Sequence, residues 1–207
     1  KHLRNIYNDP VNPDLSKKII NLFIKNFETY NMKSKIDYRT TKSKNENFFF
    51  EGLQNNIKKK QNSLIKKYAI TSIPQEINFK RSGNKFSLNN YYGNIIDLDF
   101  SHFFNNDLVF KDYEIISKKV KIFIIRNLTK EIIENEKYMA RFIFFVDVLY
   151  ENKNILSLSS EMELDKVKVK NINSFDFKRT VSRLKEMRSS EYIKDNLKLV
   201  FKRWQEF

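Results

Sequence analysis

The stretch that decides the fold prediction is residues 139–150, Met-Ala-Arg-Phe-Ile-Phe-Phe-Val-Asp-Val-Leu-Tyr. Every second residue of this stretch is apolar, which gives one continuous face: Ala140, Phe142, Phe144, Val146, Val148 and Tyr150. The opposite face mixes apolar residues with Arg141 and Asp147. A period of two with both faces largely apolar is typical of a central strand that is covered on both sides. We therefore predict that 139–150 is the central strand of a sheet.

Shorter alternating runs lie on both sides of this stretch. Residues 77–81 and 85–88 flank Ser82-Gly83-Asn84, which is a hairpin signature. Further strands are predicted from the alternation of apolar residues at 96–100, at 120–124 and at 156–164. Beyond Asp165 the apolar positions change parity, which predicts a bulge or bend. Together these runs predict a mostly antiparallel meander sheet over about 77–170.

Helical spacing occurs before and after this region. Asn12-Pro13-Asp14 is a helix start, followed by apolar residues at helical spacing, so 13–30 is predicted as a helix and 31–46 as a loop. A second helix is predicted over 49–68. The fold class is thus α+β, with an N-terminal helical pair, the sheet and a C-terminal helical segment. We predict a helical N-terminal region, 1–75, and a sheet-containing region, 76–207, with a single domain over 1–207 as the alternative.

The composition is basic, with 30 Lys, 9 Arg and a net charge of +14. This charge predicts either a nucleic-acid partner or the codon bias of an A/T-rich genome, which also favours Asn, Ile and Phe. Five lysines of the predicted helix over 49–68 form a stripe that faces either phosphate or lipid, or simply water: Lys58, Lys59, Lys60, Lys66 and Lys67. The chain has no Cys, which excludes disulfides, thiol nucleophiles and thiolate metal sites.

The glycines bear on nucleotide binding. A phosphate-cradling loop needs closely spaced glycines, but Gly52, Gly83 and Gly93 are isolated from one another. The sequence therefore predicts that the chain does not have a nucleotide-loop fold, and it predicts no cofactor.

One group of polar residues could bind a metal ion. Asp97 and Asp99 share a face of a predicted strand, and His102 follows shortly after. Two carboxylates and an imidazole would suit a divalent ion that activates water, so a metal-dependent hydrolase is one alternative function. The other interpretation, which we favour, is a strand whose polar face lies in water.

The C-terminal segment carries an apolar stripe at helical spacing, formed by Ile193, Leu197, Val200, Trp204 and Phe207. Packing within the domain and contact with another protein both remain open for it, with Trp204 as the anchor of such a contact. Without a catalytic signature, we predict a non-enzymatic interaction or scaffold protein that binds another protein, with nucleic-acid binding as the alternative.

Compartment and length are also predicted. The chain begins at Lys1 rather than Met, which predicts a fragment of a longer protein. We predict no transmembrane segment in it, and an exported, periplasmic or membrane-associated protein rather than a cytoplasmic one.

Overall fold

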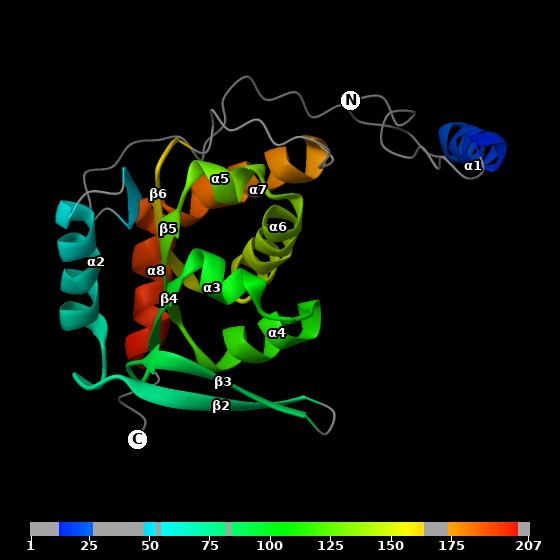
Figure 1. Ribbon diagram of the computed structural model, residues 1–207. Helices are drawn as coiled ribbons and strands as arrows, with labels where there is room; N and C mark the ends of the chain where they lie inside the picture. The colour runs from blue at the N-terminus through cyan, green and yellow to red at the C-terminus, as the bar shows by residue number, and fades with distance from the viewer. Residues whose placement is uncertain (1–12, 27–47, 53–54, 82–83, 164–173, 203–207) are drawn as a thin grey trace. The chain divides into compact units, whose positions relative to one another are not determined.

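The computed structural model describes residues 13–26, 48–52, 55–81, 84–163 and 174–202 (Figure 1). The chain forms two compact units, Lys1–Tyr38 and Arg39–Phe207. The predicted boundary between residues 75 and 76 falls inside the second unit, at the start of the strand Gln75–Arg81.

The first unit contains helix α1, Pro13–Asn26. The helix starts at the proline as predicted, because a proline at the first helical position lacks only an N–H that would be unpaired there anyway. The expected continuation to residue 30 and the expected loop over 31–46 lie outside the described residues.

The described part of the second unit forms a sheet of six strands in the order β1-β6-β5-β4-β3-β2. The strands are β1 Phe49–Glu51, β2 Gln75–Arg81, β3 Asn84–Tyr91, β4 Ile95–Asp99, β5 Ile122–Leu128 and β6 Ile155–Ser160. Three pairs of neighbouring strands are parallel: β1 with β6, β6 with β5, and β5 with β4. The other two pairs, β4 with β3 and β3 with β2, are antiparallel. The sheet is therefore mixed, with a parallel half and an antiparallel hairpin at one edge.

Helices cover both faces of the sheet. On one face lie α2, Asn55–Tyr68, and α8, Ser190–Lys202; the other is covered by α3 Phe100–Asn105, α4 Phe110–Lys119, α5 Lys130–Glu134, α6 Glu136–Glu151 and α7 Ser174–Met187 (Figure 1). Strand β5 is buried from both sides: Ile122 and Ile124 pack toward α2 and α8, while Phe123 and Ile125 pack toward the other helices. This two-sided burial explains why the first four residues of β5, Ile122–Ile125, are all apolar.

The prediction of a central strand at 139–150 is wrong, because these residues lie in α6. Asn135 caps this helix, its Oδ1 accepting from the Tyr138 N–H at 3.2 Å. The buried residues recur at helical spacing: Met139, Phe142, Val146 and Leu149. Phe144, which the strand interpretation placed in the core, is 52% exposed.

This misassignment also explains the wrong prediction of a mostly antiparallel meander. With α6 between β5 and β6, and with α3 and α4 between β4 and β5, each pair of strands is joined by a helical crossover. Such a crossover returns the chain to the same edge of the sheet and makes the two strands parallel. The α+β class itself is confirmed.

The predicted helical pair is not confirmed. Phe49–Glu51, expected in the second helix, forms β1, and Gly52 follows with φ +96°, a conformation that favours glycine. The second helix then begins at Asn55.

Other predictions hold. The structure has the hairpin β2–β3, strands β4, β5 and β6, and a helical C-terminal segment, whereas residues 164–170 lie outside the described part. As predicted, no helix among the described residues is long and apolar enough to cross a bilayer.

Candidate functional site

Polar side chains gather where the parallel strands end. The carboxyl ends of β4, β5, β6 and β1 lie at one edge of the sheet because these strands are parallel neighbours. Ligands of open α/β sheets bind outside this edge. We call it the carboxyl edge.

Arg126 of β5 is held at the carboxyl edge by a bidentate ion pair. Its Nε lies 2.5 Å from Asp97 Oδ1 and its Nη2 lies 3.0 Å from Asp97 Oδ2. Helix α2 adds two acceptors, with Gln61 Oε1 at 3.2 Å from Nη1 and Asn62 Oδ1 at 2.8 Å from Nη2. The Arg126 side chain is only 12% exposed, so its guanidinium is held in one orientation and joins β4, β5 and α2.

Gln61 is the residue of α2 that reaches the sheet, and it is 1% exposed. Besides accepting from Arg126, its Nε2 donates to Ser157 Oγ on β6 at 3.4 Å and to the Ile125 carbonyl at 3.5 Å. A buried amide is tolerated only when its donors and acceptors are paired, which these contacts achieve. The network therefore fixes α2 relative to three parallel strands.

A second set of bonds surrounds Asp99, the last residue of β4. Asn127 adopts a left-handed conformation, φ +64°, and its Nδ2 donates to Asp99 Oδ2 at 2.8 Å. The Asn127 N–H donates to Ser159 Oγ at 3.1 Å. Asp99 Oδ1 accepts from Ser101 Oγ at 2.7 Å and from the His102 N–H at 3.2 Å. Burial acts to raise the pKa of Asp99, but these hydrogen bonds outweigh it and lower the pKa below its ordinary value.

The predicted metal site is not assembled. The Asp97 carboxylate is occupied by Arg126, Asp99 caps α3, and His102 contributes its backbone N–H to that cap. Across the part of the chain that the structure describes, no three His, Asp or Glu side chains are grouped to hold a metal ion. Both aspartates instead organise the carboxyl edge.

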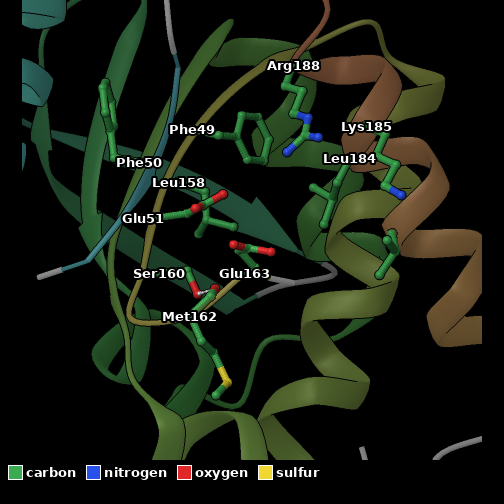
Figure 2. Close-up of a pocket in the computed structure, with 11 residues that line it drawn as sticks. Phe49, Phe50, Glu51, Leu158, Ser160, Met162, Glu163, Leu184, Lys185 and Arg188 are labelled. Carbon is green, nitrogen blue, oxygen red and sulfur yellow. Dashed lines mark hydrogen bonds between the residues drawn. The ribbon is translucent and has the colours of Figure 1, made fainter. Parts of the chain in front are cut away.

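A pocket of about 100 Å³ opens where β1 and β6 end beside α7 (Figure 2). Its apolar walls are Phe49, Leu158, Met162, Val181 and Leu184. Charged residues of both signs complete the lining: Glu51, Glu163, Lys185 and Arg188. Ligand sites for drug-sized molecules usually measure about 300–1,000 Å³, so this pocket suits a single side chain or a few waters rather than a nucleotide.

The predicted interaction stripe is placed only in part. Ile193 is 4% exposed and belongs to the core on the α2 side of the sheet, and Leu197 packs partly against that core. Val200 lies in α8, but its side chain is outside the description, as are Trp204 and Phe207 altogether. A protein contact through this stripe stays a prediction.

Three residues of the carboxyl edge were not predicted from the sequence: Arg126, Asn127 and Gln61. A signal was present for the first two, because they directly follow the apolar run Ile122–Ile125. Polar residues at the end of a buried parallel strand lie where α/β folds bind ligands. Gln61 had no comparable signal, since one glutamine on a lysine-rich helix suggests an exposed side chain.

Comparisons with known proteins extend over most of the chain. A family model described as AFG1-like ATPase matches residues 3–196. A protein of Schizosaccharomyces pombe, described as uncharacterized, is 27% identical over 133 residues, which is 63% of this chain and 29% of that protein. The chain thus spans less than a third of that relative's length. No match to a solved structure was found.

Proposed function

This chain belongs to the AFG1-like ATPase family, and we propose that it is part of an enzyme that binds and hydrolyses ATP. The observation that supports the proposal is the extent of the family match, from residue 3 to residue 196. The parallel half of the sheet is consistent with it, because α/β sheets with helices on both faces commonly bind nucleotides.

The family match overturns several predictions made from the sequence. The non-enzymatic scaffold or protein-binding function is wrong, and so is the prediction that the chain is not an enzyme. The family match also replaces the two alternative functions, a nucleic-acid-binding protein and a hydrolase at Asp97, Asp99 and His102. The glycine argument is also corrected, because lack of a phosphate-binding loop does not exclude membership of a nucleotide-hydrolysing family.

The glycine spacing has a narrower consequence. The sequence contains no Gly-x-x-x-x-Gly-Lys-Ser/Thr segment, and its three glycines are isolated. The described residues also contain no group of acidic or histidine ligands for a metal ion. These residues do not by themselves fit the triphosphate and its metal ion. We propose that the phosphate-binding loop lies in a part of the ATPase that this chain does not span.

For the chain itself we propose a positioning role. The carboxyl edge holds Arg126 and Asn127 rigidly, each bonded to a carboxylate of β4. In an assembled ATPase this edge would face the nucleotide and orient the groups that contact it. Arg126 and Asn127 would then affect the rate of ATP hydrolysis indirectly, by holding the groups that contact the nucleotide in place.

The test is ATP hydrolysis by the whole protein, measured as phosphate release. We expect turnover by the whole protein and none by residues 1–207 alone. In the whole protein, Asn127→Ala removes the bond to Asp99, and we expect it to lower kcat at least tenfold with a smaller effect on KM. The matched control is Asn106→Ala, at the exposed asparagine that follows α3. Its backbone carbonyl, which accepts from Arg141, is kept in the variant, so kcat should stay unchanged.

Two outcomes would contradict the proposal. If the whole protein released no phosphate from ATP, the proposed ATPase function would be wrong. Equal kcat values for Asn127→Ala, Asn106→Ala and the wild type would leave the ATPase function intact but exclude the role of the carboxyl edge. Thermal melts of each variant separate a loss of positioning from a loss of folding.

A further inference from the structure

The lysines of the second unit are unevenly distributed among its helices. Helix α2 has five lysines and no acidic residue, and all five are exposed: Lys58, Lys59, Lys60, Lys66 and Lys67. The helices on the opposite face, α3 to α7, together carry ten basic and nine acidic residues. Positive charge is therefore concentrated on one outer helix.

This distribution distinguishes two explanations of the net charge. A genome rich in lysine codons would place lysines on all exposed helices alike. The near-balance of α3 to α7 against the purely cationic α2 does not follow from codon usage. Helix α2 also keeps its lysines without acidic partners on the same helix, although such partners three or four residues away would stabilise it.

Exposed isoleucines follow directly after α2. Ile73 is 71% exposed and Ile70 is 43% exposed, in the short segment that leads into β2. This segment is tied to the turn between β3 and β4, because the Ile70 N–H donates to the Tyr92 carbonyl at 3.1 Å and to Asn94 Oδ1 at 3.3 Å. The Thr71 N–H donates to the same carbonyl at 3.2 Å. Ile73 is thus presented to solvent by an anchored segment.

Gly93 adds a second restraint on this segment. It has φ +83°, and a Cβ atom there would lie 2.8 Å from Ile70 Cβ. Ile70 therefore packs directly onto the glycine backbone. The result is an apolar tip, Ile70 and Ile73, next to the last lysines of α2, Lys66 and Lys67.

We propose that α2 and this tip form a docking surface for an anionic lipid bilayer. Clusters of four to eight basic residues on an amphipathic helix are attracted to acidic lipid headgroups, and neighbouring apolar side chains enter the boundary between headgroups and acyl chains. All five cations are lysines, which act as hydrated point charges suited to a diffuse anionic surface rather than to bidentate recognition. Helix α2 contributes Gln61 and Asn62 to the carboxyl edge, but the proposed surface consists of other residues of the helix and does not depend on ATP hydrolysis.

The test is co-sedimentation of residues 1–207 with vesicles at about 100 mM salt. We expect binding to phosphatidylcholine vesicles that contain about 30% phosphatidylserine, and little binding to pure phosphatidylcholine. The triple variant Lys58→Gln, Lys59→Gln, Lys66→Gln should bind roughly 100-fold more weakly, from about fivefold for each lysine near the surface. The matched control, Lys111→Gln, Lys118→Gln, Lys130→Gln, removes the same charge from the opposite face and should bind within about twofold of the wild type.

A second pair of variants tests the tip. Ile73→Ser should weaken vesicle binding severalfold and leave its salt dependence unchanged. Val109→Ser, at an apolar residue that precedes α4 and is 52% exposed, should have no effect. Equal losses from the two lysine triples would overturn the proposal, because binding would then follow net charge alone. It would also be overturned if the chain bound single-stranded RNA at this salt but did not sediment with anionic vesicles.

Discussion

Arg126 and Asp97 lie on neighbouring parallel strands, two positions out of register with one another. The Cα partner of Arg126 across the β4–β5 pair is Asp99, yet its guanidinium forms the bidentate pair with Asp97. Asp99 is left to bond Asn127 and to cap α3. The diagonal arrangement lets two carboxylates on one strand hold two consecutive residues of the next.

The first prediction tests this pair. Arg126→Gln removes the ion pair and leaves the Asp97 carboxylate, 17% exposed, without its cation. We expect the free energy of unfolding to fall by about 3 kcal/mol, because a largely buried charge that loses its partner is strongly destabilising. The measurement is the urea midpoint of the variant. Adding Asp97→Asn should recover part of the loss, and a double variant no better than Arg126→Gln would contradict the pairing.

The second prediction contrasts two phenylalanines of α6. Phe142 is fully buried and Phe144 is 52% exposed, because residues two apart lie on different sides of a helix. Phe142→Ala should lower the unfolding free energy by about 3–5 kcal/mol and Phe144→Ala by less than about 1 kcal/mol. Chemical denaturation of both variants decides the matter. Similar large losses would be the result expected of a strand.

The third prediction concerns acid stability. Because the pKa of Asp99 is lowered in the folded protein, its ionised form stabilises the fold above the unfolded-state pKa of about 3.9, and this contribution disappears as the pH falls through the folded-state value. Asp99→Asn keeps the acceptor that caps α3 but removes the charge. The variant should be less stable than the wild type at pH 6, and the difference should shrink below about pH 4. Thermal melts across this range test it, and a constant difference would argue against the assignment.

The fourth prediction uses two glycines with positive φ. Gly93→Ala would place a Cβ atom 2.8 Å from Ile70 Cβ, whereas at Gly52 the nearest atom, Ile57 Cδ1, lies 3.5 Å away. Both substitutions incur backbone strain of about 1–2 kcal/mol, so Gly52→Ala is the control. The additional loss of unfolding free energy in Gly93→Ala, relative to Gly52→Ala, measures the clash with Ile70 in the segment after α2. Equal losses would mean that this segment moves aside freely.

Local patterns predicted much of the fold. The proline-led start of α1, the hairpin around Ser82-Gly83-Asn84 and the seam through Ile193 and Leu197 each depend on neighbours in sequence, so the chemistry of a few residues is sufficient. The strand prediction for residues 139–150 was wrong because nearly all of these residues are apolar. Such a run fits a period of 2 and a period of 3.6 equally well. Length could have decided it, since sixteen residues between Asn135 and Asn152 exceed a usual strand.

The site was harder to predict because its partners are distant in sequence. Arg126 and Gln61 are joined only after α2 docks on the sheet, and that docking depends on the parallel order of β4, β5 and β6. Once α6 was assigned as a strand, this order could not be derived. The ATPase relationship was missed for a different reason: the loop that identifies most nucleotide-binding chains does not occur in this sequence.

The short edge strand β1 has a consequence for the time course of folding. Strands β4, β5 and β6 can assemble through successive crossovers between near neighbours, but β1 pairs with β6 from the opposite end of the unit. Closing so long a loop carries a large entropic cost, so we expect β1 to join a sheet that has already formed. The same strand should be the first to detach under native conditions, and the amide of Phe50 should exchange with deuterium well before that of Ile124. The pocket beside α7 would then be completed late and lost early, while the carboxyl edge at β4 and β5 persists.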